Sequence, residues 1–150
     1  MMLWKKLHVL EITDKIRIFK NAEIRYGATD DPTVSFCHVN YTAALVTQTI
    51  FTAARPVRVK SIIGRVRVAG TGGACTIAFF KAPSGTAVGS GTALHTGSYN
   101  LVGTVDANQT LTLSTTAGAL DLAAGDSIGY VLTGTATSAV GNVTVGLQPI

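Results

Sequence analysis

The chain has 150 residues, of which 47% are hydrophobic and 13% are charged, and its formal net charge is +4. This length suits one domain with a single core, and the low charge predicts that part of the surface is covered by neighbouring molecules. No window approaches the ~18 consecutive apolar residues of a membrane-spanning helix, and Glu11 ends the first apolar run too early for a typical secretory signal peptide.

Charge and glycine divide the chain into two unequal parts. Residues 1–67 contain eleven Lys or Arg and five Asp or Glu, whereas residues 68–150 contain one Lys and three Asp. Fifteen of the sixteen glycines lie beyond residue 60. We therefore predict a basic first part followed by a nearly neutral second part. Separately, we place a domain boundary within the first part, between an N-terminal segment of residues 1–33 and a domain of residues 34–150.

Residues 1–33 contain three short strand-like runs, LHVLEI, KIRIF and AEIRYG. These runs hold too little apolar mass to form a core alone, which predicts an extended arm or hairpin. The cations of its second half are Lys15, Arg17, Lys20 and Arg25. Asp30, Asp31 and Pro32 then predict a turn.

Residues 34–53 continue with a predicted strand, VSFCHV, and with NYTAALVTQTIFTA, which is compatible with a strand or a short helix. The two cysteines, Cys37 and Cys75, both lie in apolar strand-like runs. Buried free thiols are the expected state, because two cysteines do not make a disulfide framework. A disulfide bond between Cys37 and Cys75 is the alternative that the sequence leaves undecided.

Residues 54–70, ARPVRVKSIIGRVRVAG, contain five of the twelve basic residues and no acidic residue. Arg58 and Lys60 have even numbers, whereas Arg65 and Arg67 have odd numbers, so strict strand alternation would put the two pairs on opposite faces. A β-bulge at or near Gly64 would restore the phase and place all four cations on one outer face.

Three functions are compatible with this basic strand. Charges on an edge strand prevent unwanted strand addition, and a basic face can form ion pairs with an acidic protein partner. Nucleic-acid binding is less favoured, because Val and Ile alternate with the cations where aromatic stacking platforms would be expected. The first two alternatives remain open from the residues alone.

The remaining sequence predicts strands separated by glycine-rich turns. Apolar and polar residues alternate in TLTLS (110–114), SIGYVLTG (127–134) and NVTVGLQPI (142–150). No run beyond residue 55 has a helical apolar stripe. Short alternating runs of this kind predict an all-β fold, an antiparallel sandwich or barrel.

The residues that could carry chemistry are few and scattered. His8, His38 and His95 lack metal-ligand spacing, and His95 is expected to be a surface residue. Asp121 and Asp126 could contribute to a calcium site, but a turn stabilised by Asp126 and Gly125 is favoured. No nucleophile elbow occurs. We predict no catalytic residue, no metal and no cofactor, and therefore no enzyme.

Several segments together resemble virion proteins of tailed bacteriophages. They are ARPVRVKSIIGRV, GGACTIAFFKAPSGTAVGSGTAL, YNLVGTVDANQTLTLS, LDLAAGDSIGYVLTGT and GNVTVGLQPI. The pattern is similar to that of the small jelly-roll decoration, or cement, proteins on capsids, over about residues 45–150. LDLAAGDSI also resembles the strand-turn-strand step of trimeric tumour-necrosis-factor-like domains. The resemblance implies an antiparallel jelly-roll β-sandwich with an extended N-terminal arm.

The resemblance implies a homotrimer that binds the major capsid protein at the virion surface, after assembly in the host cytoplasm, and stabilises the head. No membrane or nucleic acid is implied as a partner. The implied capsid interface consists of the basic strand and the arm: Arg55, Arg58, Lys60, Arg65 and Arg67, with Lys15, Arg17, Lys20 and Arg25.

An alternative function is a receptor- or glycan-binding module of a tail or head fibre. Such a module usually exposes clustered aromatic side chains, for which Tyr99, Tyr130 and Phe80 are the candidates. A carbohydrate-active enzyme domain is a third possibility, against which the missing carboxylate pair argues.

Overall fold

A computed structural model describes residues 35–41, 47–71, 73–135 and 137–150, and strands dominate this part of the chain. The strands are β1 (Ser35–Tyr41), β2 (Gln48–Thr52), β3 (Val57–Val68), β4 (Thr76–Ala82), β5 (Thr92–Ala93), β6 (Tyr99–Asn100), β7 (Asn108–Thr110), β8 (Asp121–Leu122), β9 (Ser127–Thr133) and β10 (Val140–Pro149). One 3₁₀ turn, η1 (Val88–Ser90), follows β4. No helix within these ranges has the length and hydropathy needed to cross a membrane.

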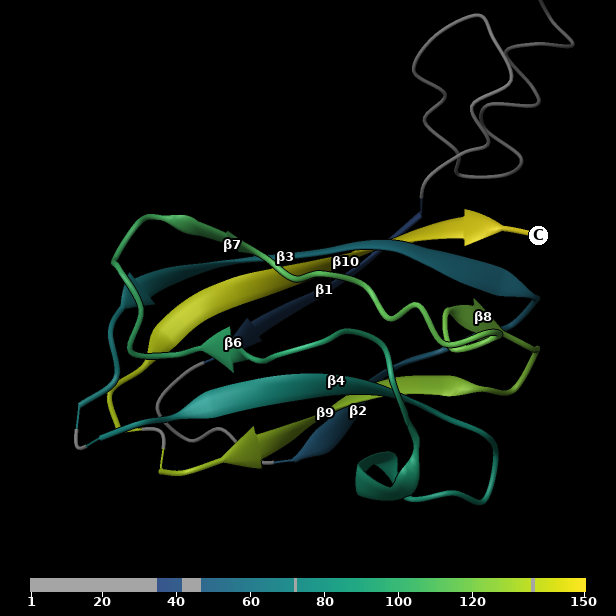
Figure 1. The fold of residues 1–150 in the computed structure, drawn as a ribbon, viewed down its shortest axis with the longest axis horizontal. Helices are drawn as coiled ribbons and strands as arrows, with labels where there is room; N and C mark the ends of the chain where they lie inside the picture. Colours follow the sequence, from purple (N-terminus) through teal and green to yellow (C-terminus); the bar gives the residue numbers. More distant parts are fainter. Residues whose placement is uncertain (1–34, 42–46, 72, 136) are drawn as a thin grey trace, which may run out of the picture.

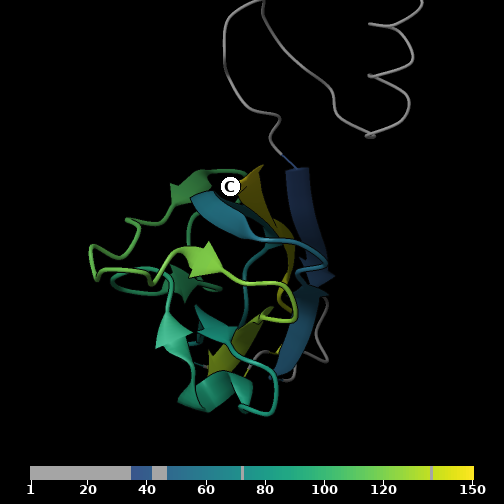
Figure 2. The same cartoon turned by 90° about the vertical axis from the view of Figure 1, so that its right-hand side faces the viewer.

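The strands form two five-stranded antiparallel sheets that pack face to face (Figure 1). Sheet A has the order β1-β10-β3-β7, and β8 also pairs with β3. Sheet B has the order β2-β9-β4-β5, and β6 also pairs with β4. Figure 2 shows the two layers from one end. The prediction of an all-β antiparallel sandwich is confirmed.

The core lies between the sheets and consists of the inward-facing residues that alternation selects. Phe79 on β4 and Tyr130 on β9 are 0% and 1% exposed, and their ring centroids lie 6.1 Å apart in an edge-to-face arrangement. β10 contributes Val143 and Val145, which are fully buried. Each large side chain removed from water in this way contributes about 1.5–3 kcal/mol.

The predicted strands are confirmed over most of the described part of the chain. Residues 127–133 and 140–149 form β9 and β10, and β1 covers residues 35–39 of the predicted VSFCHV strand, whose first residue lies outside the described ranges. Within the ambiguous 40–53 run, Gln48–Thr52 is strand and not helix. Of the predicted TLTLS strand only Thr110 belongs to a named strand, because from Leu111 onward the chain leaves β7 and crosses the edge of the sandwich.

That crossing segment joins the two sheets by backbone hydrogen bonds. Leu111 N–H donates to Ile62 O of β3 at 2.9 Å, and Ser114 N–H donates to Leu94 O at 2.9 Å. Leu94 N–H in turn donates to Phe79 O of β4 at 3.0 Å. Because these bonds run continuously from β3 to β4, this edge of the sandwich is closed rather than open to strand addition.

β3 contains a bulge, but the bulge lies earlier than predicted. β10 pairs Gly146 with Ser61 and Leu147 with Val59, so Lys60 is the extra residue. A second irregularity skips Arg67, between the pairs formed by Val66 and Val68. The bulge at Lys60 changes the phase of the strand, so that Val59 and Ile62 are both buried.

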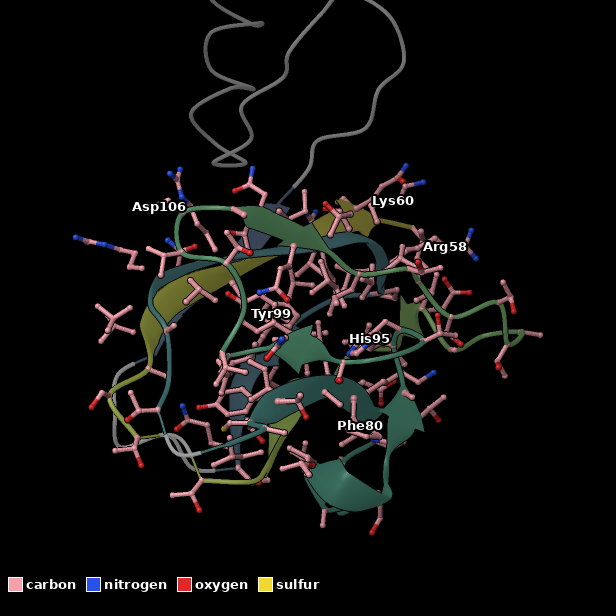
Figure 3. The ribbon with its side chains drawn as sticks, turned by 60° about the vertical axis from the view of Figure 1, so that its left-hand side comes forward. Arg58, Lys60, Phe80, His95, Tyr99 and Asp106 are labelled. Atoms are coloured by element: carbon pink, nitrogen blue, oxygen red, sulfur yellow. The ribbon has the colours of Figure 1, made fainter. Side chains whose placement is uncertain are left out.

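Gly64 has a different role from the predicted bulge. A Cβ atom there would lie 2.8 Å from Tyr99 Cζ and 2.9 Å from Val143 Cγ2. Tyr99, on β6, is completely buried, and Figure 3 shows it between the two sheets. Glycine at position 64 therefore lets the backbone of β3 lie directly on the tyrosine ring.

His95 is a buried residue, which corrects the prediction that it is on the surface. It is 5% exposed, and its Nε2 accepts a hydrogen bond of 2.9 Å from Phe79 N–H. The ring also lies edge-to-face with Phe79, with centroids 5.9 Å apart. The ring fills a position at the edge of β4 that a strand carbonyl would otherwise occupy.

The turn before β9 forms as predicted. Gly125 has a φ of +92°, and Asp126 Oδ2 accepts a hydrogen bond of 3.0 Å from Ala123 N–H. Cys75 is a buried free thiol, and burial raises its pKa. The predicted arm, residues 1–33, lies outside the described residues.

Candidate partner-binding surface

The outer face of sheet A carries the four cations of the basic strand. Arg58, Lys60, Arg65 and Arg67 are all exposed on β3, while Val57, Val59, Ile62 and Val66 are buried beneath them. The prediction that these cations share one outer face is confirmed. Figure 3 shows Arg58 and Lys60 pointing away from the core, on the opposite side of sheet A from Tyr99. Arg55 is exposed in the connection between β2 and β3.

β3 is an interior strand, which corrects the interpretation of the basic strand as a protected edge. β10 pairs with one side of β3 over its whole length, and β7 and β8 pair with parts of the other side. An interior strand has no free edge to protect. Edge protection therefore does not account for the exposed cations.

Uncharged polar residues stand beside the cations in the sheet. Asn108 of β7 and Asn142 of β10 are the register partners of Arg65, and Gln148 of β10 is the partner of Arg58. Thr110 and Thr144 are the partners of Ile63. The face thus combines positive charge with amide and hydroxyl groups, which suits polar recognition of an acidic surface.

Arg58 forms the best-defined ion pair of this face. Its Nε and Nη2 atoms donate to Asp121 Oδ1 and Oδ2 at 2.5 and 2.8 Å. This two-point contact from Arg58 lowers the pKa of the Asp121 carboxyl, and the positive charge of Lys81 adds to the effect. Asp121 therefore remains ionised, and it fixes the position of the guanidinium group.

The other three cations of the strand are less compensated. Arg65 Nε lies 3.4 Å from Asp106 Oδ1, and both side chains are at least half exposed, which makes this a weak surface pair. No acidic side chain within the described ranges pairs with Lys60 or Arg67. These two positions give the face its net positive charge.

Exposed aliphatic side chains accompany the cations. Ile63, Val68 and Val105 are 40%, 47% and 45% exposed, and Ile63 and Val68 lie on β3 itself. The backbone of the Val105 turn reaches β3, because Asp106 N–H donates to Val66 O at 2.8 Å. Apolar groups among polar ones are compatible with a protein interface.

A groove of about 400 Å³ lies at the end of this face, between β3 and the segment that connects β7 to β8. Its lining residues are Arg58, Val59, Lys60, Leu113, Ser114, Thr115, Thr116, Ala117, Gly118, Leu120 and Asp121. The groove is thus bordered by two cations on one side and by three hydroxyl groups on the other. No sequence pattern predicts this groove, because its two walls are more than fifty residues apart along the chain.

Lys81 of sheet B holds the far wall of the groove in place. Its ammonium group donates to Gly118 O at 2.6 Å and to Asp121 O at 3.0 Å. β3 forms the other wall, and its Val59 N–H joins the two walls by donating to Leu120 O at 2.9 Å. The groove is therefore a preformed feature of the fold, built from both sheets.

The aromatic side chains considered for glycan stacking are largely unavailable. Tyr99 and Tyr130 are 0% and 1% exposed, and Gln48 Nε2 donates to the Tyr130 hydroxyl at 2.9 Å. Phe80 is partly buried on β4 and is not among the residues that line the groove. Among the described residues no three His, Cys, Asp or Glu side chains are grouped as a metal ion would require.

The arm cations Lys15, Arg17, Lys20 and Arg25 lie outside the described residues. Their assignment to an interface stays a prediction. For the basic strand, the structure brings Arg58 and Lys60 together at the groove and places Arg65 and Arg67 toward the other end of β3.

No protein-family model and no curated protein matches the chain. Among solved structures, the chain is similar to one in the cyanophage Pam1 capsid asymmetric unit, with 16% identity and a TM-score of 0.49, over 86% of this chain and 96% of that one. A chain of the Ralstonia phage GP4 capsid matches with 17% identity and a TM-score of 0.46, over 85% and 91%. A chain of the disulfide-linked pili of Bacillus endospore appendages matches with 14% identity and a TM-score of 0.39, over 85% and 97%. These values are too low for any of the three likenesses to indicate a function.

Proposed function

We propose that the chain is a structural protein of a phage virion, a decoration or cement protein that binds the capsid lattice through the outer face of sheet A. The observation that carries the proposal is the basic face on an interior strand. Its cations are neither edge protection nor fully paired within the described residues, and aliphatic and amide groups lie among them. A face of this kind fits an acidic protein surface.

The proposed role requires no catalysis. A cement protein stabilises a lattice by burying area at many repeated contacts, and each contact can be of standard interface size or smaller. Positive charge on the docking face accelerates association with an acidic lattice and fixes the orientation of binding. The major capsid protein is the proposed partner.

We also propose that the sandwich is a jelly roll. β1 pairs with β10, β2 with β9, β3 with β8, and β4 with β5 and β6. Early strands thus pair with late strands in a nested order, as in a jelly roll, where a long antiparallel hairpin is wrapped around the core. The homotrimer and the N-terminal docking arm belong to the same proposal.

A binding experiment with charge-matched variants tests this function. Lys60→Gln combined with Arg67→Gln removes two positive charges from the face of sheet A. Two exposed ion pairs contribute about 0.4–2 kcal/mol together, so binding to virions that lack the protein should weaken by about 2- to 30-fold at low salt. The salt dependence of binding should also become smaller.

The matched control is Thr86→Glu combined with Ser90→Glu. These exposed residues lie on the connection that contains η1, on the sheet B side of the molecule (Figure 1), and the control changes the net charge by the same amount. Co-sedimentation with virions measures both variants. Equal weakening by the two variants, or no weakening by the first, would contradict docking through sheet A.

A further inference from the structure

We infer that the groove between β3 and the β7–β8 connection is a binding site for an extended acidic peptide segment, in which Lys60 pairs with a carboxylate of that segment. The inference rests on the proposed function, since it takes a protein as the partner. It adds a defined site and a ligand chemistry to what would otherwise be a diffuse basic face.

The charge at the groove favours an anion. Arg58 and Asp121 neutralise each other through their two-point contact. Lys60 also lines the groove and pairs with no acidic side chain in the described ranges. Because Lys60 is the bulged residue of β3, its ammonium group is not part of a regular cross-strand row. One uncompensated cation therefore remains at the groove.

The opposite wall supplies hydrogen-bond donors. The hydroxyl groups of Thr115 and Thr116 form no hydrogen bond with the described part of the chain, and both residues line the groove. Ser114 Oγ accepts a hydrogen bond from Thr116 N–H at 3.3 Å, which leaves its own proton available. A carboxylate between Lys60 and these hydroxyls would accept a charge-assisted bond on one side and neutral bonds on the other.

The apolar groups of the groove favour a peptide over a sugar. Leu113 and Leu120, which are half-buried, line it together with the polar groups, and none of the lining residues is aromatic. A glycan site usually offers an aromatic face on which the sugar ring stacks, whereas a peptide can place small aliphatic side chains on this floor. A volume of about 400 Å³ accommodates a short segment.

The walls are fixed before any ligand binds. Lys81 holds the β7–β8 connection through two backbone carbonyl groups, and Asp121 holds Arg58. A preformed site loses little conformational entropy on binding. Lys60→Gln should therefore remove a specific contact without reorganising the site.

Fluorescence anisotropy on the full chain tests the inference, with a labelled peptide of alternating glutamate and alanine and its glutamine counterpart. We expect the glutamate peptide to bind, and the glutamine peptide to bind at least fivefold more weakly. Lys60→Gln should weaken the glutamate peptide at least fivefold, whereas Arg67→Gln, which removes the same charge further along β3, should change it less than twofold. Thr115→Trp should block the groove at constant charge.

Three results would overturn the inference: equal effects of Lys60→Gln and Arg67→Gln, equal binding of both peptides, or binding of an oligomer of uronic acids while the glutamate peptide stays unbound. Failure of the proposed function is separable from these. If virions bind the Lys60→Gln and Arg67→Gln double variant normally while the peptide still requires Lys60, docking through sheet A is wrong and the peptide site stands.

Discussion

His95 combines two functions within one side chain, as a hydrogen-bond acceptor and as a core residue. A backbone N–H can only donate, so the bond from Phe79 requires an unprotonated Nε2. The proton of the neutral ring is therefore on Nδ1, which lies 3.3 Å from Thr96 O and can donate to it. Burial lowers the pKa of His95 further, because the protonated ring would carry a charge inside the sandwich.

This geometry predicts that acid destabilises the domain. The unfolded chain binds a proton at His95 more readily than the folded chain does, so the free energy of unfolding decreases as the pH falls below the ordinary histidine value of 6.5. The slope cannot exceed about 1.4 kcal/mol per pH unit for one proton. Urea unfolding at pH 7.5 and 5.5 measures the decrease.

His95→Gln provides the comparison, because its amide oxygen can accept the Phe79 bond but does not titrate. The variant should be less stable than the unchanged chain at pH 7.5 and should lose less stability on acidification. His8 and His38 are present in both proteins and cancel. An identical pH dependence of the two proteins would show that His95 is not the group that titrates.

The sequence could not reveal this residue as buried. His95 lies in GTALHTGSYN, where polar and small residues surround it and no alternation is visible. Its burial depends on the crossing segment: Leu113 lies opposite His95, and Ser114 N–H bonds to Leu94 O. Such a contact between residues that are distant in sequence has no local signal.

At the scale of the strand, β3 reconciles a buried valine face with an exposed cationic face over twelve residues. Both the single outer face of the cations and the need for a bulge could be predicted from the sequence. The cations change from even to odd positions along the strand, so strict alternation would put them on opposite faces. The prediction assigned the bulge to Gly64, since glycine is common at bulges. The structure uses Lys60 instead, and it uses Gly64 to admit Tyr99.

Gly64→Ala tests this assignment. The added methyl group would overlap Tyr99 and Val143, both of which are completely buried, so we expect a loss of about 1–3 kcal/mol in the free energy of unfolding. Chemical denaturation measures it. Gly89→Ala is the matched control, because a Cβ atom there lies 3.6 Å from Val131 Cγ2, at ordinary contact distance. Equal stability of the two variants would show that β3 does not depend on close contact with Tyr99.

The connection from β7 to β8 shows where prediction from sequence ends at this scale. TLTLS alternates like a strand, and Leu111 and Leu113 are indeed half-buried. Only the tertiary structure shows that this segment crosses between the sheets and that Lys81 fastens the turn beyond it. The groove is formed by these long-range contacts, so no local sequence motif could predict it.

At the scale of the whole molecule, the two faces of the sandwich differ in charge. Of the six Lys and Arg residues in the described part, Arg58, Lys60, Arg65 and Arg67 lie on the outer face of sheet A, and Lys81 is engaged in holding the β7–β8 connection. The residue pattern predicted the sandwich, because short alternating runs separated by glycine-rich turns favour that architecture. It could not predict which sheet would carry the cations on its outer face, since that depends on strand order.

The central claim is that this face binds a capsid, and imaging of purified virions with and without the protein tests it most directly. We predict extra density on the outer surface of the shell when the protein is present, with sheet A toward the shell and η1 on the opposite side. The same images would report the number of copies at each site and so the predicted trimer. Virions with identical density in both preparations, or a bound domain with sheet A turned toward solvent, would contradict the account.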